Sequence, residues 1–200
     1  MGIVEWVAAA LGVASVFLTI RQSIWCWPVG IAMTGLYLFI FASVQLYSDA
    51  GLQLVYIGLQ LYGWWYWLGN SGAATAQRQA PVQYLLPAGR LGWLGAGLVT
   101  SGALGYLMAT HTDAALPYWD ASTTCFSLVA QVLLARKRIE TWLVWIAVDF
   151  VSIGVYSVKG LFVTAGLYAL FLGMACWGWR EWMKALDRQQ AGRAYPAQAS

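Results

Sequence analysis

Seven apolar runs, separated by polar breaks, constrain the fold of this chain more than any other feature. A helix needs about 17 to 25 residues to cross a bilayer, and the runs meet or approach that length. Backbone groups find no water in hydrocarbon, so runs of this length are predicted to be helices. They lie at 3–20, 25–46, 51–68, 91–110, 116–135, 141–158 and 161–179.

The composition agrees with an integral membrane protein. Hydrophobic residues make up 60% of the 200 residues and charged residues only 10%, whereas a soluble domain carries about 25% charged residues. The net charge of +3 is small, and the basic residues are not patterned as a nucleic-acid-binding face, which argues against a nucleic-acid partner. The first basic residue, Arg21, follows the first apolar run, so this run is expected to remain as a helix rather than to be cleaved as a signal peptide.

The basic residues predict the orientation of the chain in the membrane. With seven crossings, ten of the eleven Lys and Arg residues fall on one side and Lys159 alone falls on the other. The side rich in basic residues is predicted to be cytoplasmic. The N-terminus is then outside, residues 183–200 form a polar cytoplasmic tail, and the chain is expected to fray from Arg180 onward.

An internal repeat links the two halves of the sequence. Sliding the chain by 115 residues superposes 18–67 on 133–182 without a gap. Ala and Leu are common in this sequence, so their matches say little, and the evidence for the repeat is the matching Trp and Gly residues. They are Trp27 with Trp142, Gly58 with Gly173, Gly63-Trp64 with Gly178-Trp179, and Trp67 with Trp182.

The repeat predicts an all-α membrane protein with seven transmembrane helices in a 3+1+3 arrangement. Repeat one spans 3–68, a linker helix spans 91–110, and repeat two spans 116–182, so that 1–182 is a single membrane transporter domain. The two repeats begin on the same face and are therefore parallel, related by a pseudo-two-fold axis along the membrane normal. Parallel repeats of this kind are a transporter design, with the substrate site where the halves meet.

One acid stands in the middle of the sixth apolar run. Asp149 is the only charge between Trp142 and Val158, and positions 142, 145, 149, 152 and 156 share one helical stripe. An acid near the bilayer centre costs about 2.5 to 3.5 kcal/mol, so Asp149 is expected to face protein or a watery cavity. Aromatic residues beside an acid suit a flat cationic solute. The alternative is a structural hydrogen bond to a neighbouring helix.

Other helices contribute polar residues to the same predicted site. The repeat offset maps Asp149 onto Thr34, and the helices at 51–68 and 116–135 carry polar stripes of their own, the second of which also includes Asp120 and Ser127. Hydroxyls in membrane helices often bond only to neighbouring helices, and this alternative stays open for Thr124 and Ser127. The predicted substrate-binding residues are Asp149, Trp145, Ser152, Tyr156, Thr34, Tyr37, Gln53, Gln60, Trp64, Thr124 and Gln131.

The remaining residue types predict neither catalysis nor a metal or cofactor. The one histidine, His111, falls in a loop, and Cys26, Cys125 and Cys176 are far apart and are expected to be buried as small hydrophobes. An intramembrane enzyme would lack a nucleophile and base, so the chain is not expected to be an enzyme. Tryptophans near helix ends are predicted to anchor at the membrane interface. They are Trp25, Trp65, Trp93, Trp119 and Trp182.

Two other function classes fit the sequence less well than a facilitator does. A proton-coupled small-molecule transporter could use Asp149 as its relay, but it would need a second ionisable group at the midplane, and the apolar runs offer none. A sensor or scaffold would leave the polar stripes unexplained.

A longer motif carries a resemblance to a known family. The run Pro117-Tyr-Trp-Asp-Ala-Ser-Thr-Thr, then Gln131, then Arg136-Lys-Arg-Ile-Glu-Thr-Trp-Leu-Val-Trp-Ile-Ala-Val-Asp149, resembles the PnuC family of bacterial vitamin transporters, and the similarity covers about residues 5–182. The resemblance implies a SWEET-like fold, a homotrimer, a location in the bacterial inner membrane, and facilitated uptake of nicotinamide riboside, thiamine or riboflavin that a cytoplasmic kinase then traps. Nicotinamide riboside and thiamine are flat cations, whereas riboflavin is neutral, so Asp149 argues against riboflavin.

Overall fold

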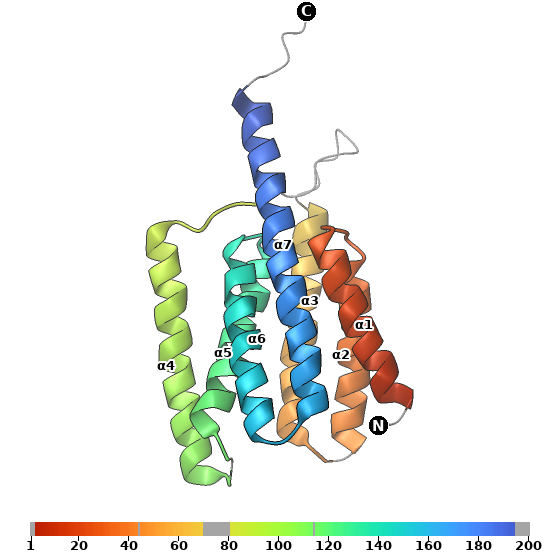
Figure 1. Cartoon of the computed structure of the whole chain (residues 1–200), viewed down its shortest axis with the longest axis vertical. Coiled ribbons are helices and arrows are strands. Elements are labelled where there is room, and N and C mark those ends of the chain that lie inside the picture. The colour runs from red at the N-terminus through yellow and green to blue at the C-terminus, as the bar shows by residue number, and fades with distance from the viewer. Residues whose placement is uncertain (1–2, 44, 70–80, 114, 195–200) are drawn as a thin grey trace, which may run out of the picture. The chain divides into compact units, whose positions relative to one another are not determined.

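The computed structural model describes residues 3–43, 45–69, 81–113 and 115–194, and these residues form seven helices (Figure 1). The helices are α1 (Ile3–Ile20), α2 (Cys26–Ser43), α3 (Tyr47–Gly69), α4 (Pro87–His111), α5 (Pro117–Ala135), α6 (Glu140–Val158) and α7 (Phe162–Ala194). Each predicted apolar run is therefore helical.

The predicted end of the last helix is wrong. The apolar run stops at 179, and the residues from Arg180 onward were expected to fray, but α7 continues to Ala194. Charged residues end an apolar run without ending a helix, because Glu, Lys, Arg and Leu are all good helix formers. Trp182 and Leu186 are also buried, so this part of α7 is held by packing. Residues 195–200 of the expected tail lie outside the described residues.

Four of the described helices, α2, α4, α6 and α7, are long and apolar enough to cross a membrane, and α1 contains a shorter apolar stretch, Trp6–Ile20. The other two, α3 and α5, are more polar. They carry Gln53 and Gln60, and Thr124 and Gln131, which are residues of the predicted substrate site. The role of these residues in a substrate site stays a prediction.

Proline and acidic residues mark the beginnings of several helices. Pro87 opens α4 and Pro117 opens α5. Proline suits the first turn of a helix because its φ is already helical and the N–H that it lacks has no acceptor there. Asp49, Asp120 and Glu140 stand in the first turns of α3, α5 and α6, where a carboxylate stabilises the positive end of the helix dipole.

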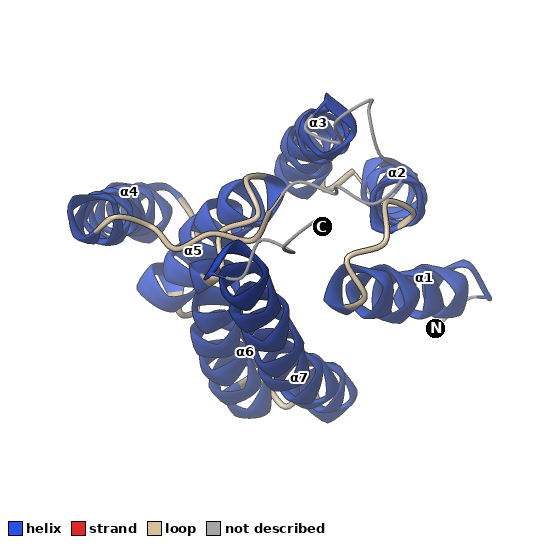
Figure 2. Ribbon diagram, turned by 90° about the horizontal axis from the view of Figure 1, so that it is seen from above, coloured by secondary structure: helices blue, strands red, loops and turns tan. Residues whose placement is uncertain are grey.

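The chain divides into two compact units, residues 1–83, 135–137 and 177–200 in the first and residues 84–134 and 138–176 in the second. In the first unit α2 contacts both α1 and α3 (Figure 2). In the second unit α4 packs on α5 through glycines, because a Cβ on Gly97 would lie 2.6 Å from the Phe126 ring and one on Gly105 would collide with Tyr118. Small residues let two membrane helices approach closely in this way.

The turns after α1 and α2 have counterparts 115 residues later in the sequence. The backbone is left-handed at Gln22 (φ 54°) and Gln45 (φ 61°), and again at Lys137 (φ 50°) and Gly160 (φ 74°). Three of these residues carry a side chain that disfavours this conformation, so it is the turn that demands it.

The hydrogen bonds that close these turns recur at the same spacing. They are Ser23 N–H to Leu18 O and Arg138 N–H to Leu133 O, both at 2.9 Å, and Leu46 N–H to Phe41 O at 2.9 Å and Leu161 N–H to Tyr156 O at 2.8 Å. The repeat detected in the sequence is therefore also present in the local backbone structure of the turns.

Three tryptophans and one lysine form a buried cluster in the first unit. The rings of Trp27 and Trp67 meet edge to face with their centroids 5.3 Å apart, and the centroid of Trp182 lies 6.3 Å from that of Trp67. The Nζ atom of Lys137 lies 4.2 Å from the centroid of the Trp67 ring, and the lysine is only 1% exposed. Gly63 leaves room for the Trp27 ring, which any Cβ there would enter.

Two expectations about burial are wrong. Trp182 was predicted to be an interfacial anchor, but it is fully buried and its Nε1 donates a hydrogen bond to the Thr19 carbonyl at 3.2 Å. Cys176 was expected to be buried but is exposed, whereas Cys26 and Cys125 are buried as predicted. In a membrane helix an exposed thiol faces lipid at little cost, so hydrophobicity alone does not predict its burial.

Burial lowers the pKa of Lys137 from its ordinary value of 10.5 to about 8. The cause is desolvation of the ammonium group by burial. Between these two values the unfolded chain binds a proton that the folded protein does not bind. The stability of the folded state should therefore rise as the pH increases from about 7 towards 10.

The substitution Lys137→Met tests this cost, because it keeps the length of the side chain and removes the charge. We expect the variant to unfold at a higher temperature than the wild type at pH 7, and the difference to shrink at pH 9.5, as followed by tryptophan fluorescence in detergent. Lys184→Met, at an exposed lysine beside Glu181, is the matched control and should change little. A lower unfolding temperature for Lys137→Met at pH 7 would contradict this account.

Candidate functional site

Asp149 lies on the buried face of α6. It is 3% exposed, and Ser152, three residues further along the same stripe, is also buried. Phe150, on the opposite face, is 71% exposed. The low exposure of Asp149 agrees with the prediction that it faces protein or a watery cavity, whereas the exposed side chain next to it in the sequence is apolar.

The Asp149 carboxylate accepts no hydrogen bond from the part of its own unit that the structure describes. Among the described residues of 84–134 and 138–176, no backbone or side-chain group donates to it, and no cation pairs with it. A buried carboxylate without donors is unfavourable by several kcal/mol on general grounds. The structural hydrogen bond to a neighbouring helix is therefore not formed among the described residues of this unit, and the role of Asp149 in binding stays a prediction.

Aromatic side chains follow Asp149 along the same helix. Tyr156, two turns after Asp149, is half-buried and stacks on Tyr168 of α7 with ring centroids 5.2 Å apart and an angle of 16° between the rings. Tyr168 in turn meets Phe171 edge to face at 6.3 Å. Trp145, one turn before Asp149, is half-buried. Aromatic residues therefore stand on both sides of the acid along α6.

Thr34 and Gln60 form the corresponding polar pair in the first unit. Both are buried, and Gln60 Nε2 donates a hydrogen bond to Thr34 Oγ1 at 2.6 Å, while Thr34 donates to the Gly30 carbonyl at 2.7 Å. A Cβ on Gly30 would collide with Oε1 of Gln60, so the glycine makes room for the amide. The structure brings these two predicted site residues together and joins them to each other.

The two units differ at these three matched positions. At the offset of 115 residues, Thr34 corresponds to Asp149, Gln60 to Ala175, and Gly30 to Trp145. Ala175 is buried and its methyl group can donate no hydrogen bond. The donor that satisfies Thr34 in the first unit is therefore missing at the matched position in the second, where the acid stands.

The other predicted site residues lie in less enclosed surroundings, apart from Gln131 of α5, which is buried. Tyr37 is half-buried and stacks on Phe41 at 5.9 Å. Gln53 and Trp64 of α3 are half-buried. Thr124 of α5 is half-buried too, and its backbone carbonyl accepts a hydrogen bond from the Ser127 hydroxyl of the same helix at 2.8 Å. The role of these residues in binding stays a prediction.

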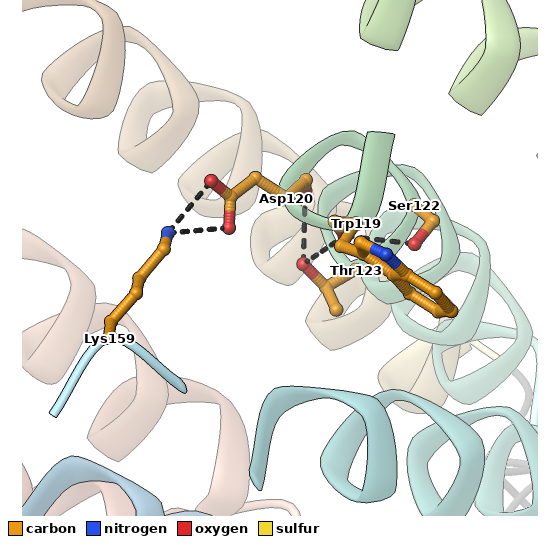
Figure 3. Close-up of polar contacts among 5 residues, drawn as sticks. All are labelled: Trp119, Asp120, Ser122, Thr123 and Lys159. Carbon is orange, nitrogen blue, oxygen red and sulfur yellow. Dashed lines mark hydrogen bonds and ion pairs between the residues drawn. The ribbon is translucent and has the colours of Figure 1, made fainter. Parts of the chain in front are cut away.

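Asp120 was placed on the polar stripe of α5, but it pairs with Lys159 at the end of α6 (Figure 3). Lys159 Nζ lies 2.9 Å and 2.8 Å from the two carboxylate oxygens, and both side chains are partly exposed. The neighbouring hydroxyls of Ser122 and Thr123 donate to carbonyls of their own helix. This end of α5 is therefore occupied by structural contacts.

A second polar network was not predicted from the sequence. Both oxygens of Glu140, in the first turn of α6, accept a hydrogen bond from Leu85 N–H at 3.1 Å, and Glu140 Oε1 also binds Arg90 at 2.9 Å. Arg138 donates to the Tyr84 carbonyl at 3.0 Å. Because these partners are about 50 residues apart, no local spacing could have revealed them. The network fixes the beginning of α4 against the helix that carries Asp149.

The described residues contain no group of three or more His, Cys, Asp or Glu side chains arranged to hold a metal ion.

Comparison with known proteins identifies the family. The family described as nicotinamide mononucleotide transporter matches residues 2–184. Two similar proteins are the riboflavin/roseoflavin transporter RibM of Streptomyces davaonensis, 29% identical over 89% of this chain and 83% of that protein, and the nicotinamide riboside transporter PnuC of Escherichia coli, 25% identical over 96% and 89%.

The fold is similar to a solved structure. The crystal structure of the vitamin B3 transporter PnuC matches with a TM-score of 0.74 and 24% identity, covering 92% of this chain and 82% of that one. The predicted family is therefore confirmed, the chain is an all-helical multi-pass membrane protein, and its relatives are transporters. Because the family match spans residues 2–184, this chain belongs to the nicotinamide mononucleotide transporter family and is a vitamin-type transporter of the PnuC family.

Proposed function

We propose that this chain carries nicotinamide riboside across the bacterial inner membrane by facilitated diffusion, and that a cytoplasmic vitamin kinase traps the riboside by phosphorylation. The observation that carries the proposal is the Asp149 carboxylate, which is buried on α6 without a donor among the described residues of its unit. A cationic ligand supplies what this carboxylate lacks. The pyridinium ring of nicotinamide riboside is a flat cation of that kind.

The aromatic residues along α6 support the same ligand. Trp145 and Tyr156 stand one and two turns from Asp149 on its stripe, and aromatic faces attract flat cations by about 0.5 to 2 kcal/mol. Ser152 is buried beside the acid and offers a hydroxyl to ribose or carboxamide groups. The remaining predicted residues, Thr34, Tyr37, Gln53, Gln60, Trp64, Thr124 and Gln131, belong to the proposed site as polar and aromatic lining.

Two other vitamins compete with this assignment. Riboflavin is favoured by the 29% identity to RibM, but it is neutral and would leave the Asp149 carboxylate without a cation. Thiamine carries a positively charged thiazolium ring and satisfies the same charge argument, so it is the alternative ligand. Nicotinamide riboside ranks first because the relative PnuC is named for it and it is also cationic.

The proposal includes the 3+1+3 arrangement of helices, with α1 to α3 and α5 to α7 as parallel repeats, α4 as the linker and 1–182 as one transporter domain. Three observations support it. The matched turns share left-handed residues, their hydrogen bonds recur at the same spacing, and the buried pairs Trp27 and Trp142, and Trp67 and Trp182, occupy matched positions. Parallel repeats are a recurrent transporter design.

The orientation is also part of the proposal. The Lys and Arg count places the N-terminus outside and the C-terminal part of α7 in the cytoplasm, where the trapping kinase acts. By resemblance to the PnuC family, the transporter is expected to form a homotrimer.

Coupling to a proton gradient is the rival mechanism, and it would use Asp149 as the proton relay. Asp149 is the only Asp, Glu, Lys, Arg or His within α6 after its first turn, so this helix offers no second such group to the relay.

Substituting Asp149 by Asn tests the site at nearly constant shape. A hydrogen bond to a charged group contributes about 1.5 to 3 kcal/mol, so the affinity for nicotinamide riboside should fall by about tenfold to more than a hundredfold. Ser152→Ala, one turn away on the same buried face, is the matched control and should lose less. If Asp149→Asn lowers the unfolding temperature while the folded fraction binds normally, the acid is structural and the proposed site is wrong.

The facilitator mechanism is tested in proteoliposomes with the membrane potential clamped at zero. Labelled nicotinamide riboside should equilibrate across the membrane at the same final level with or without an imposed pH gradient. Encapsulating a riboside kinase and ATP should then raise the total label inside without changing the initial rate. Accumulation of unmodified riboside driven by the pH gradient, and lost on adding an uncoupler, would overturn the proposal in favour of proton coupling.

A further inference from the structure

A groove lies between α4 and α5 in the second unit. None of the predicted substrate-binding residues lines it. Its volume is about 250 Å³, at the small end for a ligand site. Its walls include Trp93, Ala96 and Thr100 of α4 and Cys125, Val129 and Val132 of α5. It runs beside the glycine stripe through which α4 packs on α5.

The lining of the groove is almost entirely apolar, and its polar groups are the Thr100 hydroxyl, the Cys125 thiol and the Trp93 indole N–H. The one hydroxyl, that of Thr100, donates to the Ala96 carbonyl of its own helix at 2.7 Å. A riboside or another hydroxyl-rich solute would lose its hydrogen bonds with water here and gain few. An apolar chain is the kind of molecule that the groove suits.

The groove opens on the surface of a membrane-spanning helix. Ala96 and Thr100 are exposed, and α4 is one of the described helices that are long and apolar enough to cross the bilayer. Two helical turns separate Trp93 from Thr100, which corresponds to about 10 Å along the axis. Acyl chains of bilayer lipids are the molecules that such a surface meets, and a stretch of this length accommodates part of one chain.

A guanidinium group is carried by the helical turn of α4 that precedes the lining residue Trp93. Arg90 lies one turn before Trp93 on α4, and it is held by two contacts with Glu140, one from Nε at 3.0 Å and one from Nη2 at 2.9 Å. Its side chain is still 51% exposed. Arginine has five N–H donors, so donors remain beyond those directed at Glu140. Tyr84, whose ring centroid is 5.8 Å from Arg90 Cζ, also contacts the guanidinium.

We infer that this groove binds one phospholipid, with part of an acyl chain between α4 and α5 and the phosphate at Arg90. The apolar lining selects the chain, and the fixed guanidinium selects the phosphate through charge-assisted hydrogen bonds. Because Arg90 and Glu140 also join the start of α4 to α6, a lipid bound here contacts the network that supports the helix carrying Asp149.

A photoactivatable phosphatidylglycerol, with a diazirine in its acyl chain, tests the acyl site on the full-length protein in nanodiscs. Ala96→Phe fills the groove from an exposed position and should abolish crosslinking to peptides of α4 and α5. Ala109→Phe, the same change at an exposed position on another face of α4, should not. Equal crosslinking in the two variants would overturn the inference. A change in oligomeric mass with Ala96→Phe, and no change in crosslinking, would show that a second copy fills the groove instead.

The cysteines provide a readout that needs no substitution. Cys125 lines the groove, whereas Cys176 is exposed and lies outside it. After lipid is stripped in detergent, adding phosphatidylglycerol should slow modification of Cys125 by N-ethylmaleimide several-fold and leave Cys176 unchanged. Diacylglycerol with the same acyl chains lacks the phosphate and should need about a tenfold higher concentration for the same protection of Cys125, the effect of losing one charge-assisted hydrogen bond. Equal protection by the two lipids would refute the role of Arg90, and protection by neither would refute the site.

Discussion

A carboxylate inside a membrane-spanning helix has to be stabilised by some partner, and the described residues of its own unit supply none to Asp149. The surrounding unit buries the acid, directs it away from lipid and places aromatic residues along its stripe, but donates no hydrogen bond to it among the described residues. The Glu140 and Arg90 contacts hold the helix that carries it. Such a site is favourable for a cation and unfavourable when empty.

The comparison of matched positions explains how such a site arises from a repeat. In the first unit Gln60 satisfies Thr34, and Gly30 makes room for the amide. At the matched positions in the second unit the amide is replaced by the methyl group of Ala175 and the glycine by Trp145. One unit thus has a closed polar pair and the other an open acid beside an aromatic ring. The matched turns have the same left-handed backbone, so the two halves differ at these positions in their side chains.

The helices and the burial of Asp149 follow from the sequence because both depend on local pattern. Apolar runs of bilayer length have to be helical, and an isolated acid has to avoid lipid. The end of α7 was missed because the loss of apolar residues ends membrane burial but not helical hydrogen bonding. Lys137 was missed because a lysine in a basic loop is expected in water, and only the three-dimensional approach of Trp67 buries it. The pairing of Gln60 with Thr34 likewise depends on the spacing between α2 and α3, which no pattern within one helix reveals.

The central claim is that Asp149 recognises the positive charge of the substrate. It is tested most directly by measuring the affinities of the wild type and Asp149→Asn for nicotinamide riboside and for its reduced, uncharged form on purified protein. The account predicts that the substitution weakens binding of the charged riboside and has little effect on binding of the reduced form. The loss of affinity for the charged riboside should be at least about tenfold larger than the loss for the reduced form. Equal losses for both ligands would contradict it, because they would show that Asp149 does not read the charge.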